Sequence, residues 1–362
     1  MKMRIALILL FGLTFAFGLN AQGKKKKKTE DEITQTLPVL KDPPPAVSAE
    51  TGKLVFHVSP LSSKGLLSQQ IRDALKALFQ ENHGAAIVKL RAFVAGSGDL
   101  RRVQQLVSEI FTDHKLNLPA LSTIQVGALP QESAQVVIES IAIEKRTLHP
   151  NGLAFFSGQQ TKDVRLSMAQ LETAVKSAGV QPADVLRTTC FLSSLDDVAT
   201  ARHTVSAAFP GASANFVQLQ RDALSPLVEC EAVGRLSGSP ASAVVLVNPP
   251  QLAANPNYSQ IALVNAPKIV FTGTQMAFGE QDSDVRLAFE RLRKALEPLG
   301  VSYKDVFWSS TYPLTRAVAD QVRAIRFQFL DRSRPPASTL VLFEGLPSLD
   351  ARVAMDVIAA VP

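Results

Sequence analysis

Length and composition indicate a folded protein of more than one domain. The chain has 362 residues, 46% of them hydrophobic, which suggests about two or three domains with buried cores. Its net charge is +6, but residues 1–50 hold 8 basic and 5 acidic residues, leaving 30 and 27 for the remainder. Because basic and acidic residues nearly balance in this remainder, its composition does not indicate nucleic-acid binding. Two cysteines exclude a disulfide-rich scaffold and a four-cysteine zinc site.

The N-terminal segment is typical of an exported protein. Lys2 and Arg4 precede an apolar run over residues 5–19, and this pattern predicts a signal peptide over residues 1–21, cleaved after Ala21. The mature chain would then be secreted or periplasmic, with no stable membrane insertion. Leu19 is bulky for its position before the cleavage site, so an uncleaved anchor stays open. Residues 22–50, with a lysine run and the run Pro43-Pro44-Pro45, are expected to be a disordered linker.

The body shows a threefold repeat of one pattern, a strand, a helix, a strand, a helix and two strands. Helical faces recur with the same spacing, and Gly179 and Gly300 each lie 15 residues after the first apolar position of a face, Val164 and Val285. The expected single strands are residues 54–58, 87–94, 153–157, 185–192, 269–272 and 306–312. The expected paired strands lie in residues 119–143, 210–234 and 336–360.

The repeat divides the body into units 51–146, 147–237 and 258–362, with a second linker over residues 238–257. Two helices cover one face of a sheet, yet strand residues such as Trp308 place apolar side chains on the other face. We therefore expect an α+β protein whose three sheets pack against one another as an intrachain pseudo-trimer. Closed threefold assembly would leave the chain monomeric.

The motifs of these units resemble the RidA family, also called YjgF or endoribonuclease L-PSP. Leu129-Pro130 with residues 136–142 resembles its C-terminal signature, and residues 187–192 resemble its second strand. Ser157-Gly158-Gln159 and residues 272–275 resemble its "SGQ" strand, and Tyr258-Ser259-Gln260 its N-terminal "YSQ". Together these motifs cover nearly all of residues 54–361.

The resemblance implies a chorismate-mutase-like fold, a trimer and ligand clefts between subunits. Family members hydrolyse enamine and imine intermediates of amino acids to keto acids and ammonia. An arginine after the Pro-Ala of the Pro-Ala-x-Ser turn holds the substrate carboxylate, and a C-terminal glutamate with water transfers protons. No cofactor is implied.

This chain departs from the pattern at the arginine. By motif alignment the position holds Leu121, Ala212 and Ser338, none of which can pair with a carboxylate. We therefore expect little deaminase activity on 2-imino acids. Tyr258 and Gly273, with the acid Asp356, indicate that the third unit keeps the best preserved cleft.

The acid position is retained, and it supplies the candidate catalytic residues Glu139, Glu231 and Asp356. Each is either a proton-transferring group in a desolvated cleft or a hydrogen-bonded structural acid. The candidate ligand-binding residues are Tyr258, Gly273, Ser338, Thr339, Gly158, Ser213 and Ser122. The alternative, which the pattern favours for the serine and threonine hydroxyls, is that they cap turns, and glycine within a strand also marks a bulge. The five histidines form no cluster, so we expect no metal site.

Cys190 and Cys230 both lie in the second unit, on strands that the family fold places side by side. Export permits a disulfide, but we expect buried thiols, since bridges between neighbouring strands are geometrically awkward.

Three functions remain open. The first is a binding protein that holds a small organic ligand in remodelled clefts between domains. The second is an enamine or imine deaminase, or a related hydrolase. The third is an interaction scaffold with closed clefts. Open polar clefts would separate the first two from the third, and approach of an arginine or lysine from another unit to the acid would favour the enzyme.

Overall fold

The computed structural model describes residues 40–96, 98–220 and 226–362. The expected signal peptide, residues 1–21, lies outside these residues, as do residues 22–39 of the expected linker. Within the described part of the chain, no helix is both long and apolar enough to span a bilayer.

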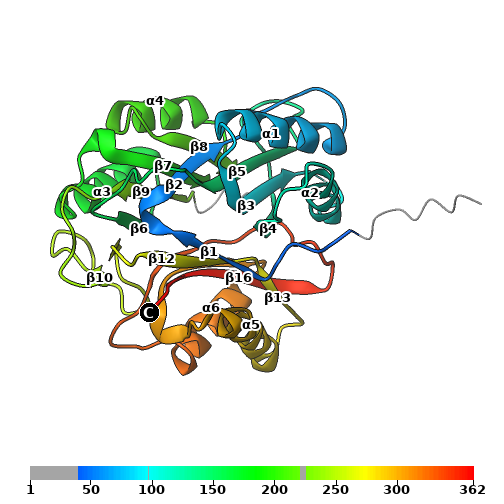
Figure 1. Ribbon diagram of the computed structural model, residues 1–362. Coiled ribbons are helices and arrows are strands. Elements are labelled where there is room, and N and C mark those ends of the chain that lie inside the picture. Colours follow the sequence, from blue (N-terminus) through cyan, green and yellow to red (C-terminus); the bar gives the residue numbers. More distant parts are fainter. Residues whose placement is uncertain (1–39, 97, 221–225) are drawn as a thin grey trace, which may run out of the picture. The chain divides into compact units, whose positions relative to one another are not determined.

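Three mixed β-sheets form the framework of residues 40–362 (Figure 1). The first sheet has the order β2 (Leu54–Val58), β5 (Val136–Ile143), β3 (Ala86–Ala95), β4 (Ala120–Val126). The second has the order β10 (Val244–Val247), β11 (Ile261–Val264), β6 (Leu153–Thr161), β9 (Val228–Arg235), β7 (Val185–Leu192), β8 (Ser213–Gln218). The third has the order β1 (Ala46–Glu50), β12 (Lys268–Thr272), β16 (Ala351–Ala360), β14 (Val306–Pro313), β15 (Ala337–Leu340), and β13 (Gln275–Phe278) also pairs with β16.

Each sheet has two amphipathic helices on its outer face, and each helix comes after one of the sheet's strands in the sequence (Figure 1). They are α1 (Leu67–Glu81) and α2 (Arg101–Asp113), α3 (Val164–Ser177) and α4 (Val198–Ala208), and α5 (Asp282–Leu296) and α6 (Arg316–Ile325). Single 3-10 turns lie at Thr51–Lys53, Pro182–Asp184, Glu297–Leu299, Tyr303–Asp305 and Arg326–Gln328. Asp163 caps α3 and Thr315 caps α6, since each side chain accepts a backbone N–H of the first turn. The architecture is mixed α+β, as expected from the sequence.

Five apolar clusters hold the elements together. Three lie between a sheet and its helices, and two lie between the sheets themselves. Trp308, expected to be buried, is 4% exposed and packs on Phe155 of the second sheet rather than beneath a helix. The inner faces of the three sheets are therefore buried against one another.

Strand register gives the three sheets matching inner faces. Glu139, Glu231 and Asp356 occupy equivalent places on β5, β9 and β16, opposite Arg91, Thr189 and Ser310. Because side chains alternate along a strand, the inward residues form layers along β3, β7 and β14. These layers are Lys89, Arg187 and Trp308; then Arg91, Thr189 and Ser310; then Phe93, Phe191 and Tyr312.

Two short strands lie within segments expected to be linkers. Residues 46–50 form β1, which pairs with β12 of the third sheet, and residues 244–247 form β10, which pairs with β11. In turn β11, just after Tyr258, pairs with β6 of the second sheet rather than with the third. Open sheet edges require a partner, and apolar pattern alone does not say which edge a short strand will cover.

Cys190 and Cys230 form a disulfide, so the expectation of free thiols was wrong. The two residues face each other directly in the antiparallel register of β7 and β9, with 4.1 Å between their Cα atoms. Side chains of directly opposed residues in such a pair lie close together, which places the two sulfur atoms within bonding reach.

Candidate functional site

The three candidate catalytic acids meet at the junction of the sheets. Arg91 of the first sheet donates from Nε to Glu139 at 2.8 Å and from Nη2 to Glu231 of the second sheet at 2.6 Å. The Arg187 guanidinium lies 3.7 Å from Glu139 and 3.8 Å from Glu231. We call this set, with Lys89 and Asp356, the central ion network.

Every carboxylate in the central ion network is engaged by protein groups. Glu139 accepts from Thr189 at 2.6 Å and Asn215 at 2.8 Å, and Glu231 accepts from Thr339 at 2.6 Å. Burial opposes ionisation of Glu139, but the charges of Arg91 and Arg187 prevail and lower its pKa. These contacts stabilise the ionised form of Glu139.

The third acid is held in the same manner. Ser122, Tyr312 and Lys89 donate to Asp356 at 2.5, 3.0 and 3.3 Å. Burial lowers the pKa of Lys89, whose Nζ also reaches the carbonyl of Thr272 at 2.6 Å. A cation from another sheet thus approaches each of the three acids. This meets the condition that would favour an enzyme, but the cavity of about 30 Å³ that adjoins the network has room for water and not for an organic substrate.

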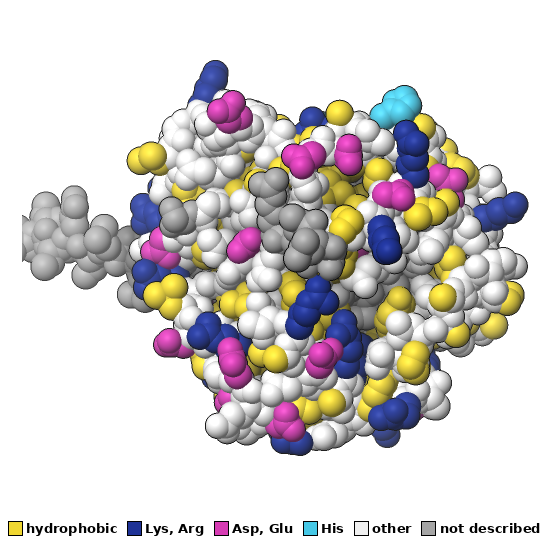
Figure 2. Space-filling view, turned by 180° about the vertical axis from the view of Figure 1, so that it is seen from behind, with side chains coloured by type: hydrophobic (Ala, Val, Ile, Leu, Met, Phe, Trp, Pro, Cys, Tyr) yellow, Lys and Arg dark blue, Asp and Glu magenta, His cyan; other side chains and the backbone are white. Residues whose placement is uncertain are grey.

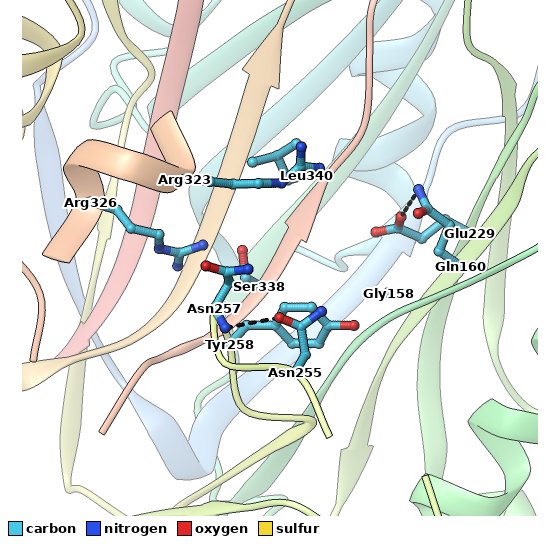
Figure 3. A pocket seen from close by; sticks show the side chains of 10 residues that line it. All are labelled: Gly158, Gln160, Glu229, Asn255, Asn257, Tyr258, Arg323, Arg326, Ser338 and Leu340. Carbon is cyan, nitrogen blue, oxygen red and sulfur yellow. Dashed lines mark hydrogen bonds between the residues drawn. The ribbon is translucent and has the colours of Figure 1, made fainter. Parts of the chain in front are cut away.

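The remaining candidates divide into two groups. Gly158, Tyr258 and Ser338 line one cleft, together with Gln160, Glu229, Asn255, Asn257, Arg323, Arg326 and Leu340 (Figure 3). Ser213 instead donates to the carbonyl of Phe56, and Gly273 packs on the backbone of Leu121. Tyr258 therefore shares its cleft with neither Gly273 nor Asp356, which corrects the expected third-unit site.

The strand register changes two of the equivalences that motif alignment assigned between the repeats. Gln159 and Gln275 are equivalent, because they face Cys230 and Met355, the residues just before Glu231 and Asp356. Counting back, Gly273 matches Ser157, not Gly158. Likewise the position matching Leu121 and Ser338 is Ala214, since it pairs with Thr188, and not Ala212. None of the three is a cation.

The cleft lies between the second and third sheets and has a volume of about 90 Å³. Gly158 and Gln160 come from β6, Glu229 from β9, and Ser338 and Leu340 from β15. Asn255, Asn257 and Tyr258 precede β11, and this segment is fixed where Ser157 donates to the carbonyl of Ser259 at 2.6 Å. The space accommodates several water molecules or a small organic ion.

Arg326 supplies the cleft with a cation. Its side chain is 3% exposed, and its Nε and Nη2 have no hydrogen-bond partner among the described residues. In Figure 3 its guanidinium points toward Ser338 and Asn257. Burial, then the charge of Arg323, lowers its pKa to about 10, so it stays charged at neutral pH. Its Cζ lies 5.7 Å from the centre of the Phe327 ring. A buried cation with such a contact and no ion pair among the described residues is costly, and a bound anion would satisfy it.

Glu229 supplies the opposite side of the cleft with an acid. Burial raises its pKa to about 8, with Glu231 adding to the rise, so its carboxyl is mostly protonated at pH 7. Gln160 donates to it at 3.2 Å. A Cβ on Gly158 would lie 2.0 Å from its Oε1, so glycine there makes room for the carboxyl. The equivalent residues two before the other acids are Val137 and Ala354, both apolar.

Sequence reasoning missed Arg323, Arg326 and Glu229. The sequence could have pointed to Glu229, because it lies on the same strand face as Glu231 at a position where the other two repeats hold apolar residues. The arginines left no such signal, since a charge at the end of a helical pattern is normally solvated.

The described residues contain no group of three or more His, Cys, Asp or Glu side chains placed to hold a metal ion. The donors that line the cleft are instead guanidinium, amide, hydroxyl and carboxyl groups, which suit a polar organic ligand.

Comparison with known proteins agrees with the motifs. Residues 45–144 match the family model described as Endoribonuclease L-PSP. This region, which contains the first sheet and its helices, is similar to that family. A search of curated proteins gives no match.

Solved structures of the family are similar to about one third of the chain. A Rid-family protein of unknown function from Yersinia pestis, YyfB, is 13% identical, with a TM-score of 0.30, over 33% of this chain and 99% of its own. A YjgF/YER057c/UK114-family protein from Mycobacterium tuberculosis is 18% identical, with a TM-score of 0.25, over 33% and 99%. One from Neisseria meningitidis is 17% identical, with a TM-score of 0.25, over 30% and 91%. Because these scores are low, the assignment rests on the family match.

Replacing Arg91 with leucine should destabilise the protein by about 3–5 kcal/mol, because Glu139 and Glu231 would lose their shared buried partner. Urea denaturation measures the change. The control is Arg101→Leu, whose ion pair with Asp99 is exposed and should matter by less than about 1 kcal/mol. Equal midpoints for both variants would show that the central ion network is not structural.

Glu229→Gln should remove a pH dependence of stability. The pKa of Glu229 is about 8 when folded and 4.5 in its ordinary state. The folded protein thus binds more protons between these values, and its stability falls as pH rises through them, by at most about 1.4 kcal/mol per pH unit. Denaturation at pH 5 and pH 8 should show a smaller loss for Glu229→Gln than for wild type. If both proteins lost the same stability between pH 5 and pH 8, a group other than Glu229 would be responsible for the pH dependence.

Proposed function

We propose that the protein binds a small organic anion in the cleft between the second and third sheets. The observation that carries this proposal is Arg326, a buried cation with two unpaired N–H donors beside a polar cavity. Charge-assisted bonds to a carboxylate would compensate its desolvation. Gly158, Tyr258 and Ser338 complete the wall, and Arg326 takes the cationic role that the family gives to the Pro-Ala-x-Ser turn.

The binding proposal is preferred to an interaction scaffold because the cleft is open and polar. Of the inter-sheet positions named by the motifs, Gly273 and Ser213 are packed against neighbouring backbone. The Tyr258 position borders a polar cavity of about 90 Å³, against about 30 Å³ beside the central ion network. Basic and acidic side chains are interspersed on the face shown in Figure 2, which supports a small ligand rather than a nucleic acid.

The second candidate is an enamine or imine deaminase, favoured by Glu229. A carboxyl with a pKa of about 8 can donate a proton near neutral pH. Arg326 would orient the substrate carboxylate, a water molecule would add to the imine carbon, and Glu229 would protonate the nitrogen that leaves as ammonia when the carbonyl forms. Glu139, Glu231 and Asp356 do not take part in this scheme, because the central ion network holds them.

We further infer that the three sheets are three RidA-like domains of one exported, monomeric chain. The matched registers of their inner faces and the paired helices on each sheet support the intrachain pseudo-trimer. The disulfide supports export, since such bonds persist in oxidising compartments. The remaining domains would span residues 147–237 and 258–362, with β1 and β11 crossing between sheets.

Arg326→Gln should lose binding of small carboxylates at least about tenfold without losing stability, since it removes a charged group that lacks partners. Calorimetric titration with butyrate and 2-oxobutyrate measures affinity, and thermal unfolding measures stability. Arg101→Gln is the control for net charge. Ammonia release from 2-iminobutyrate by the same variants and by Glu229→Gln tests the deaminase. If Arg326→Gln bound these carboxylates with wild-type affinity, Arg326 would not be the group that binds the ligand.

Export and assembly can be tested on one preparation. The exported protein should begin at Gln22, contain no free thiol and scatter light as a single chain. A stable trimer of full chains would contradict the pseudo-trimer, and a reduced, uncleaved chain would contradict export to an oxidising compartment.

A further inference from the structure

The cleft has two chemically distinct ends. At one end Arg326 presents unpaired N–H groups toward Ser338 and Asn257. At the other end lie Glu229 and Gln160, with Arg323 extending from α6 toward Leu340 (Figure 3). A ligand with a single anionic group can satisfy only one of these ends.

The positive charge on the side chains that line the cleft exceeds the negative charge of one carboxylate. Arg323 and Arg326 are both cationic, and the carboxyl of Glu229 is mostly uncharged at pH 7. Arg323 also pairs with Asp320 at 2.7 Å, but that aspartate is 72% exposed and so weakly coupled. The Arg323 side chain is itself 44% exposed. A monoanion bound at Arg326 would leave Arg323 without an anion on the cleft side.

The end of the cleft at Glu229 is suited to a ligand oxygen that accepts a hydrogen bond. Gln160 and the backbone N–H of Leu340 donate to the carboxyl, which leaves its own proton free for a ligand oxygen. The charged groups that face Glu229 are Glu231 on its own strand and Arg323 on α6, and Tyr258 faces it from the segment before β11. A carboxylate there would accept from the protonated acid and from Arg323.

We propose that the cleft selects short dicarboxylates over monocarboxylates, with one carboxylate on Arg326 and the second between Arg323 and Glu229. This inference rests on the proposed function and adds the ligand class. The cavity of about 90 Å³ limits the ligand to a few carbon atoms. Neither the family motifs nor the candidate residues of the sequence indicate a second carboxylate.

The test compares succinate with butyrate, which has the same chain length and one carboxylate fewer. Titration calorimetry of the full mature chain at pH 6.5 and fixed ionic strength should give succinate at least about tenfold tighter binding. Arg323→Gln should abolish this preference by lowering succinate affinity toward that of butyrate. Arg101→Gln, on the outer helix of the first sheet, should leave the preference unchanged and so control for long-range charge.

A rise to pH 9 provides an independent readout, because it ionises Glu229 and sets two negative charges against each other. Succinate affinity should fall toward that of butyrate in the wild type and stay unchanged in Glu229→Gln, whose amide remains a donor. Equal affinities of succinate and butyrate for the wild type at pH 6.5 would overturn the dicarboxylate inference and leave the anion site standing. Failure of both to bind would overturn the proposed function as well.

Discussion

The structure depends on one constraint, the burial of six charged groups where three sheets meet. Arg91, Arg187 and Lys89 face Glu139, Glu231 and Asp356, and the two sets balance. Balanced charges in a dry interior are tolerated only if each finds partners in good geometry. Here several of those partners come from different sheets, so the ion pairs tie the sheets to one another. Apolar clusters on both sides exclude water and strengthen this requirement.

The same layered plan shows where function departs from packing. Glu229 occupies a place that is Val137 and Ala354 in the other sheets, and Arg326 is buried without the partners that every ion of the central network has. Groups that weaken the fold in this way are typical of ligand sites. The acids at the family's own position are instead committed to holding the sheets together.

Strand exchange links the sheets further. β1 belongs in sequence to the first sheet but completes the third, and β11 belongs in sequence to the third but completes the second. The exchange of β11 carries Tyr258 to the border of the second and third sheets, where Gly158 and Ser338 lie. The cleft therefore exists because a short strand crosses from one sheet to the next.

Local pattern was sufficient for much of this protein. Apolar periodicity located the helices and most strands, because burial of one face depends only on nearby residues. Motifs placed Gly158, Tyr258 and Ser338 among the candidates. Tertiary structure alone decided that Glu139, Glu231 and Asp356 contact buried arginine and lysine side chains and that Cys190 bonds Cys230. It alone brought Arg326 and Glu229 to one cleft. Ionisation and pairing depend on partners far away in sequence, so only the packing of the three sheets could settle them.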